Sequence, residues 1–351
     1  MNCSILRKLI RVRILVVISR PILLLSLLNY DTNNVSWNDI NSILYIISIT
    51  LSCYAIIYCN GASDMVNFKG QVVLITGAAR GLGFAYARYI GQLGAMVLIQ
   101  DIGANSLGEG TDPQVAEFAA ETLRLEGLNV QAIIGNIDSR EGCQKLCHDA
   151  LKVAGRLDAL IHNAGWVAYE DIESIKESSF DHMMDIAAKA PLWLSQAVWP
   201  TMKAAGYGRI IMTTSCRALY PQYVHKGLAS YAAAKMAIVG IMNVLAYEGK
   251  NDGIIVNAIS PVAKTRMWGI EEEPADLYPA SVAPGVAYLA SAACIEGGWI
   301  LRAANGQFHA TKMMEAENVN YPLNLRAIQA STIQEMVENW QYIAIPSVEP
   351  R

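Results

Sequence analysis

The stretch that decides the fold is QVVLITGAARGLGFAYARYI, which spans residues 71–90. Its first six residues form a nearly continuous apolar run, typical of a strand that is covered on both faces. Of the glycines that follow, Gly77 permits a tight turn, Gly81 lets the backbone approach a pyrophosphate, and Gly83 allows close helix packing. The helix begins near Leu82, where unpaired N–H groups and a positive dipole end favour phosphate. The stretch therefore predicts a dinucleotide-binding loop rather than an ordinary glycine-rich turn.

The rest of the chain alternates short apolar runs with longer amphipathic segments. Strands are expected at 71–76, 95–100, 130–134, 159–162, 209–213, 253–259 and 299–301. Helices are expected at 82–93, 113–126, 140–153, 180–204, 231–247 and 281–293. This alternation predicts an α/β Rossmann-type fold, a doubly wound parallel sheet of about seven strands with helices on both faces. Ligands of such a sheet bind beyond the carboxyl ends of its strands.

Two charged side chains bear on the choice between NAD and NADP. Asp101 follows the second expected strand, where a carboxylate accepts hydrogen bonds from the adenosine ribose and repels a 2′-phosphate. Arg80 in the glycine loop favours the opposite choice, because a basic side chain there can meet a 2′-phosphate. Since Asp101 stands where the ribose is expected, we predict NAD as the cofactor, with NADP as the second choice.

A tyrosine and a lysine four residues apart open the expected helix 231–247. This spacing places Tyr231 and Lys235 on one face of the helix, and three alanines between them leave room for a cofactor. To exchange protons near neutral pH, the pKa of a tyrosine must fall by about 3 units from about 10. A nearby lysine and a cationic nicotinamide ring both shift the pKa in that direction.

Ser215 follows the expected strand 209–213, and its hydroxyl can bond the substrate oxygen that gains or loses the proton. Thr214 and Ser230 are competing candidates for this role. The three predicted catalytic residues are therefore Ser215, Tyr231 and Lys235.

Composition limits the partners of this 351-residue chain. Its formal net charge is -4, and a nucleic-acid binder should instead show a dominant basic face. Its 7 cysteines have no spacing typical of a disulfide framework. Cys143 and Cys147, with the adjacent His148, are better read as buried structural residues than as metal ligands. We therefore predict no metal, a small-molecule substrate and a cytoplasmic location.

The first 64 residues differ from the rest of the chain. Residues 1–30 hold five basic side chains and no acidic one, and 43–59 is apolar at the lower limit for crossing a bilayer. The segment can be a membrane anchor, a targeting segment, or upstream sequence translated ahead of a natural start at Met65. We favour the third reading, and membrane association is expected only if the segment belongs to the protein. The predicted parts are the extension 1–64, the catalytic domain 65–312, and the C-terminal extension 313–351 with a helix at 327–343.

Together these motifs resemble the short-chain dehydrogenase/reductase family over about 67–307. Residues 76–83 match its TGxxxGxG motif, 162–165 resemble its NNAG element, and Ser215, Tyr231 and Lys235 match its catalytic triad. Ser260 and Pro261 stand where the family often has a Pro-Gly pair that closes over the nicotinamide. The cofactor-binding residues expected from the motifs and the resemblance are Gly77, Arg80, Gly81, Leu82, Gly83, Asp101, Asn136, Ile137, Asn163, Ala164, Gly165, Tyr231, Lys235 and Pro261.

Within the family, the chain most resembles the dehydrogenase region of peroxisomal multifunctional β-oxidation enzymes and their bacterial relatives. The segments that carry this likeness are 100–103, 136–139, 257–261 and 265–267. The resemblance implies oxidation of a (3R)-hydroxyacyl-CoA thioester with NAD, by a homodimer or homotetramer.

Three departures from the family pattern stand out. Ala187 occupies the place of the usual catalytic asparagine, so a proton relay through that side chain is missing or rebuilt with water. Tyr231 follows Ser215 by 16 positions, a few more than usual, and the extra residues lie around 224–226. Val262 replaces a common glycine. His225 and Lys226 can contact a polar substrate group such as a CoA phosphate, but a solvated loop is the preferred reading.

Two alternatives remain. One is an NADPH-dependent 3-oxoacyl reductase, or a steroid or sugar dehydrogenase, on the same fold, because a fold does not decide its substrate. The other is a non-catalytic NAD-binding sensor or scaffold. Ala187 motivates this second reading, and the intact Ser215, Tyr231 and Lys235 argue against it.

Overall fold

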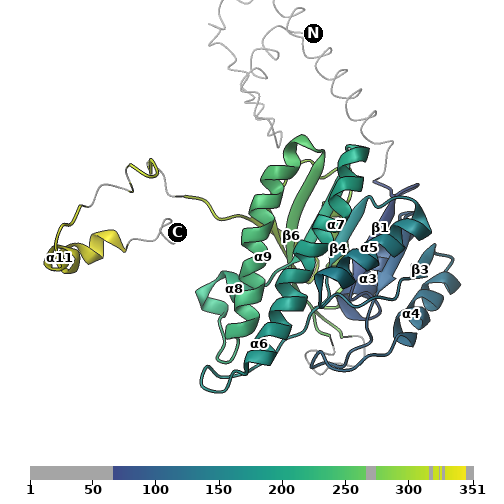
Figure 1. The fold of residues 1–351 in the computed structure, drawn as a ribbon, viewed down its shortest axis with the longest axis horizontal. Helices are drawn as coiled ribbons and strands as arrows, with labels where there is room; N and C mark the ends of the chain where they lie inside the picture. The colour runs from purple at the N-terminus through teal and green to yellow at the C-terminus, as the bar shows by residue number, and fades with distance from the viewer. Residues whose placement is uncertain (1–65, 266–273, 316–318, 324, 326–328, 345–351) are drawn as a thin grey trace, which may run out of the picture. The chain divides into compact units, whose positions relative to one another are not determined.

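The computed structural model describes residues 66–265, 274–315, 319–323, 325 and 329–344 (Figure 1). The extension 1–64, including the apolar run 43–59, lies outside the described residues. So do the first two residues of the helix expected at 327–343.

A single sheet of eight strands forms the centre of the described fold, in the order β3-β2-β1-β4-β5-β6-β7-β8. The strands are β1 Val72–Thr76, β2 Met96–Gln100, β3 Val130–Ala132, β4 Ala159–His162, β5 Gly208–Thr213, β6 Ile254–Val262, β7 Ile300–Ala304 and β8 Gln307–Thr311. β1 to β7 are parallel, as predicted, and the order reverses between β1 and β4. The carboxyl ends of β1 and β4 therefore flank the position where ligands bind in such sheets.

β8 was not predicted. It pairs antiparallel with β7, and Ala304 faces Gln307 across a two-residue turn. Asn305 and Gly306 occupy that turn with φ angles of 49° and 75°. Positive φ at both positions is the type I′ geometry that suits a hairpin, and Asn-Gly is its usual sequence.

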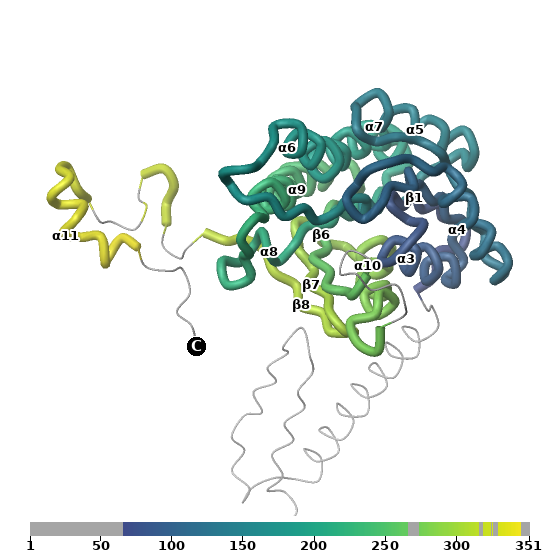
Figure 2. Tube along the Cα trace, turned by 90° about the horizontal axis from the view of Figure 1, so that it is seen from below, coloured from purple at the N-terminus to yellow at the C-terminus, as the bar shows by residue number. Residues whose placement is uncertain are grey.

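Helices cover both faces of the sheet. The helices of the described residues are α3 Gly81–Gln92, α4 Gln114–Leu125, α5 Arg140–Ala154, α6 Glu177–Met184, α7 Ala190–Ala205, α8 Cys216–Leu219, α9 Ala229–Glu248, α10 Ala283–Ala290 and α11 Ile333–Ile343, and the last of these has no buried residue. Short turns of helix lie at η1 Asp185–Lys189, η2 Pro221–Tyr223, η3 Gly249–Asn251 and η5 Pro279–Ser281. Figure 2 shows α5, α7 and α9 on one side of the strands and α3 and α10 on the other, and two separate clusters of buried apolar side chains match these layers.

The helix expected at 180–204 is interrupted. α6 ends at Met184, a π-helical turn (η1) follows, and α7 starts at Ala190. Pro191 in the first turn of α7 has no N–H to donate to the preceding turn, which explains a break in the regular hydrogen-bond ladder here. The wider turn holds Ala187, which is buried.

α9 is apolar enough, by length and composition alone, to cross a membrane. It packs instead on the sheet, where Ile238, Val239 and Met242 are buried in the core together with residues of β5 and β6. α9 is therefore a core helix, and the side chains at its start stand on a rigid support.

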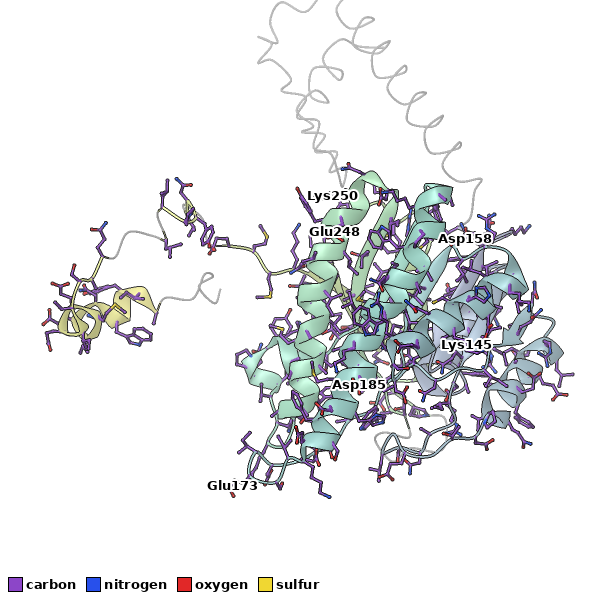
Figure 3. The ribbon with its side chains drawn as sticks, in the orientation of Figure 1. Lys145, Asp158, Glu173, Asp185, Glu248 and Lys250 are labelled. Carbon is purple, nitrogen blue, oxygen red and sulfur yellow. The ribbon has the colours of Figure 1, made fainter. Side chains whose placement is uncertain are left out.

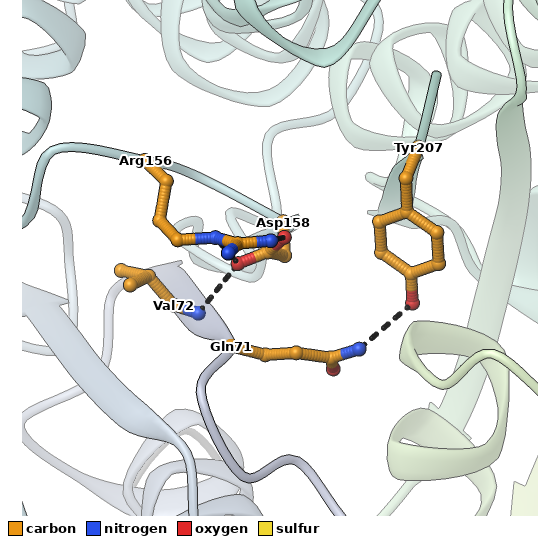
Figure 4. A network of polar contacts seen from close by, with 5 residues as sticks. All are labelled: Gln71, Val72, Arg156, Asp158 and Tyr207. Carbon is orange, nitrogen blue, oxygen red and sulfur yellow. Dashed lines mark hydrogen bonds and ion pairs between the residues drawn. The ribbon is translucent and has the colours of Figure 1, made fainter. Parts of the chain in front are cut away.

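The two ends of the sheet have different roles. At the amino end, Asp158 accepts a hydrogen bond from the Val72 amide at 2.8 Å and pairs with Arg156, while Gln71 donates to Tyr207 (Figure 4). This network joins the starts of β1 and β4. Figure 3 shows Glu173, close to α6, at the opposite end, where the carboxyl ends of the strands carry the candidate site.

Candidate active site

A cleft of about 1180 Å³ lies at the carboxyl ends of β1, β2 and β4. Ten of the fourteen predicted cofactor residues line it: Gly77, Arg80, Gly81, Leu82, Asp101, Asn136, Ile137, Asn163, Ala164 and Gly165. Gly83, Tyr231, Lys235 and Pro261 do not line it. Its volume exceeds the range typical of pockets for drug-sized ligands, so it has room for an extended ligand.

The glycine loop is built so that backbone meets backbone. Gly77 and Gly81 have φ angles of 61° and 53°, which disfavour other residues. A Cβ on Gly83 would lie 2.2 Å from the carbonyl oxygen of Gly77 and 2.8 Å from Nδ2 of Asn163. The same Nδ2 donates to the Gly77 carbonyl at 2.8 Å. Gly83 thus acts by allowing the loop to close on the first turn of α3.

Asp101 holds the adjoining loop as well as facing the cleft. Its carboxylate accepts hydrogen bonds from the amides of Ala79 at 3.0 Å and Gly103 at 2.9 Å. Arg80 lines the same cleft and donates to the carbonyl of Ala104 at 3.3 Å. A carboxylate and a guanidinium therefore both border the part of the cleft that follows β2.

His162, the first residue of the element that resembles NNAG, joins three parts of the site. Thr76 Oγ1 accepts the amides of Asn163 and Ala164, so its own hydrogen points to His162 Nδ1 at 3.0 Å. Nε2 then carries the ring proton and donates to the Ile186 carbonyl of η1 at 3.1 Å. Burial and the charge of Lys235 lower the pKa of His162 to about 3. The neutral imidazole thus ties the π-helical turn to the ends of β1 and β4.

Tyr231 and Lys235 share one face of α9, as their spacing predicted. Nζ of Lys235 lies 5.9 Å from the centre of the Tyr231 ring and donates to the Thr213 carbonyl at 3.0 Å. Lys235 is almost fully buried, which lowers its pKa to about 8. The Thr214 hydroxyl donates to the Lys235 carbonyl at 2.6 Å, so this competitor of Ser215 is engaged in supporting the helix.

Ser215 is the N-cap of α8 and stands beside Tyr231. Its Oγ accepts the amide of Arg217 at 3.3 Å, and its hydroxyl is close enough to Tyr231 to lower the pKa of the phenol. The two predicted hydroxyl groups are therefore neighbours in the site.

The pKa of Tyr231 differs from the sequence-based expectation. Burial raises it above its ordinary value, while the Ser215 hydroxyl and the charge of Arg217 act in the opposite direction. The side chains of the chain alone do not supply the lowering we expected, because desolvation of the phenol outweighs them. An oxidised nicotinamide bound beside Tyr231 would supply a positive charge that lowers the pKa.

Arg217 was missed from the sequence. It follows Ser215 by two positions, its charge favours the Tyr231 phenolate, and Nη1 hydrogen-bonds to the Tyr169 hydroxyl. The signal in the sequence was a basic residue shortly after β5. The direction in which the Arg217 side chain points depends on the short helix α8, which the sequence did not predict.

Other predicted features lie away from this centre. Lys226 pairs with Asp171 at 2.7 Å and is 85% exposed, which favours the solvated-loop reading. Pro261 and Val262 end β6 and are half-buried. The thiols of Cys143 and Cys147 are buried, which raises the pKa of each to about 12.

Comparison with known proteins adds three findings. A family model described as short chain dehydrogenase matches residues 71–274. The chain is 32% identical over 286 residues to peroxisomal multifunctional enzyme type 2 of Mus musculus, covering 79% of this chain and 37% of that protein. It is 32% identical over 285 residues to the peroxisomal hydratase-dehydrogenase-epimerase of Neurospora crassa, covering 80% and 31%. The chain thus spans less than half the length of these two relatives.

Among solved structures, a short chain dehydrogenase from Mycobacterium avium is similar, with a TM-score of 0.67 and 27% identity. The match covers 80% of this chain and 97% of that protein. The likeness therefore extends over the whole Rossmann-type domain of that structure.

Proposed function

Because the chain belongs to the short-chain dehydrogenase family, and is thus an NAD(P)-dependent oxidoreductase acting on CH–OH groups, we propose that it oxidises (3R)-3-hydroxyacyl thioesters with NAD. The observation that carries the proposal is the convergence of Ser215, Tyr231 and Lys235, with Lys235 Nζ 3.6 Å from the place that a Cβ on Gly165 would take. Gly165 lines the 1180 Å³ cleft. The substrate class is supported by the peroxisomal multifunctional relatives, one of which is named as a hydratase-dehydrogenase-epimerase.

In the proposed reaction, a secondary alcohol becomes a ketone. Ser215 orients the substrate oxygen, and the Tyr231 phenolate takes the hydroxyl proton as the carbonyl forms. The nicotinamide supplies the hydride acceptor when it is bound. Lys235 holds the nicotinamide ribose and keeps a positive charge beside Tyr231. Arg217 adds a second charge that favours the phenolate.

His162 provides a hydrogen bond to the backbone at the turn where Ala187 has no polar side chain. Its Nε2–H holds the carbonyl of Ile186, next to the position where the family has its usual asparagine. The backbone of η1 is thereby kept in one place without a polar side chain at 187. In our proposal the relay to solvent runs through water at this turn rather than through a side chain.

The choice of NAD rests on Asp101. Its carboxylate borders the cleft after β2, where it repels a 2′-phosphate. Arg80 supports the alternative, an NADPH-dependent reductase of 3-oxoacyl or other ketone substrates, because its guanidinium borders the same part of the cleft. The carbonyl of Ala104 already occupies one of its N–H groups.

The deciding experiment measures reduced nicotinamide formed by the full chain with (3R)-hydroxyacyl-CoA esters of graded length, and with NAD or NADP. We expect turnover with NAD whose rate depends on the length of the acyl group. In Tyr231→Phe this rate should fall by about 100-fold or more. Tyr247→Phe is the matched control, because Tyr247 lies on the same helix and is 75% exposed. Cofactor binding without turnover of any ester would contradict the acyl-thioester assignment. Turnover with NADP alone would favour the alternative.

The homodimer or homotetramer and the cytoplasmic location remain predictions. Size measurement of the full chain in solution tests the first, and localisation of a tagged full chain tests the second.

A further inference from the structure

A second cavity, of about 250 Å³, lies at the β6–β7–β8 side of the sheet. Nine residues line it: Cys216, Ser260, Val262, Arg302, Ala303, Ala304, Gln307, Phe308 and His309. None of these residues belongs to the lining of the cofactor cleft as described. We call this cavity the Arg302 niche.

Strand register builds one wall of the niche. Ser260 pairs with Arg302, and Arg302 pairs with His309, so these three side chains stand in one row across β6, β7 and β8. Paired residues project from the same face of a sheet. The row is therefore held at spacings that the backbone hydrogen bonds dictate, unlike a cluster on a surface loop.

Arg302 is a cation that no carboxylate of the described residues pairs with. Its Cζ lies 4.9 Å from the ring centre of Tyr220 and 5.7 Å from that of Tyr223, and the two rings are perpendicular. Among the described residues, the structure gives the Arg302 side chain no hydrogen bond and no ion pair. Contact with ring faces leaves the N–H groups in the guanidinium plane available to an acceptor.

Ser260 supplies the second observation. It is 1% exposed, it lines the niche, and its hydroxyl has no hydrogen-bond partner in the described part of the chain. A buried hydroxyl without a partner is costly, since it loses its bonds to water and gains none in return. Its position beside a cation suggests an acceptor that both groups share.

We propose that the Arg302 niche binds a small oxyanion, a carboxylate or a phosphate group. The planar guanidinium offers the paired N–H donors that match two oxygens of such a group, and Ser260 offers an O–H donor beside it. A cavity of about 250 Å³ has room for one such group with a short attached chain.

The niche adjoins the catalytic side of the molecule. Cys216 in its wall follows Ser215 directly, and Tyr220 and Tyr223 belong to the segment that leads from Ser215 toward Tyr231. Two sources of the oxyanion fit this position: an acidic group carried by the substrate, and free phosphate. The inference goes beyond the proposed function, because binding of the anion needs no turnover.

Calorimetric titration of the full chain with inorganic phosphate, and separately with acetate, tests the proposal. We expect saturable binding of at least one anion, weakened about tenfold or more in Arg302→Met. Arg302→Lys keeps the positive charge but removes the paired N–H donors of the guanidinium, so this variant should bind the anion more weakly than the wild type. The matched control is Lys312→Met, which removes a cation 4.2 Å from the Trp299 ring, outside the niche, and should bind like wild type.

Absence of saturable binding to the wild type overturns the proposal. So does equal binding by Arg302→Met, or an equal loss in Lys312→Met, which would mean general charge attraction. Circular dichroism and cofactor binding show whether each variant is folded. If phosphate competes with an acidic substrate but not with a neutral one, the niche receives the substrate's acidic group, and if it competes with neither, the niche takes the free ion.

Discussion

The ammonium group of Lys235 lies one helical turn from Tyr231, 5.9 Å from the centre of its ring, and bonds to the carbonyl oxygen of Thr213 at 3.0 Å. It thereby ties the start of α9 to the end of β5 while its charge stays beside the phenol. The same burial that fixes the group lowers its pKa to about 8. Holding this cation therefore carries a pH-dependent cost in the free energy of folding.

Replacing Lys235 by methionine should remove that cost. The pKa is 10.5 in the unfolded chain and about 8 in the folded one, so between these values the unfolded chain binds more protons. The cost is fully present below pH 8 and is relieved as the pH rises to 10.5. Across this window we expect the free energy of unfolding of the wild type to rise by about 3 kcal/mol relative to that of Lys235→Met. Urea unfolding near both limits measures it, and a difference that is independent of pH contradicts it.

Replacing Arg217 by methionine should raise the pKa of Tyr231, because a charge that favours the phenolate is lost. Tyr231 acts as a base in alcohol oxidation, so kcat/KM rises with pH as it ionises. This rise should move to higher pH in Arg217→Met and stay close to the wild-type position in Arg217→Lys. Initial rates across the pH range measure both. Identical profiles for all three proteins would rule out a role of Arg217 in the ionisation.

Two glycines should respond to alanine with opposite signs. Gly83→Ala places a Cβ 2.2 Å from the Gly77 carbonyl, so the loop must shift, which costs about 1–3 kcal/mol of stability. We also expect cofactor binding about tenfold weaker or worse. Gly240→Ala, inside α9 with no atom outside the local helix backbone within 4 Å of the new Cβ, should stabilise the fold by about 0.5–1 kcal/mol. Thermal unfolding and cofactor titration measure these effects. Normal cofactor affinity in Gly83→Ala would refute the closed-loop account.

Neutral His162 should make the fold sensitive to acid. Its pKa is 6.5 in the unfolded chain and about 3 in the folded one, so the unfolded chain binds more protons between these values. The stabilisation is present above pH 6.5 and is lost as the pH falls toward 3. Over this window the free energy of unfolding of the wild type should fall by about 4 kcal/mol relative to that of His162→Asn.

Denaturant unfolding at several pH values between these limits tests the His162 prediction. His148→Asn is the control, since that side chain is exposed on α5 and should keep the wild-type slope. Equal slopes for His162→Asn and the wild type would mean that His162 does not stay neutral in the folded chain.

The sheet and the glycine loop could be predicted because their signals are local. The run 71–90 combines a strand, three glycines and a helix, and the structure has β1 and α3 there with Gly77 and Gly81 at positive φ. The Rossmann-type fold and the family resemblance are thus confirmed. The proximity of Ser215 and Tyr231 also follows from strand order, since both stand beyond the carboxyl end of β5.

What the sequence did not predict depends on single residues or on long side chains. β8 was missed although Asn305 and Gly306 are a hairpin signal, because the strand after them alternates weakly. The break at η1 has its signal in Pro191, which an apolar helical pattern conceals. Arg217 reaches Tyr169 only because α8 turns it in that direction. The partners of such a side chain depend on tertiary packing, which no periodicity reveals.

The length of the β7–β8 turn decides which side chains of β8 face the Arg302 niche. Side chains alternate between the two faces of a strand, so one residue more or fewer at 305–306 would exchange every side chain of β8 from one face to the other. With one residue fewer, Phe308 and Ala310 would stand where Gln307 and His309 do now, while β1 to β7 kept their pairing. A change in this turn alone would therefore replace the β8 side chains in the wall of the niche. The residues Ser215, Tyr231 and Lys235 would stay in place.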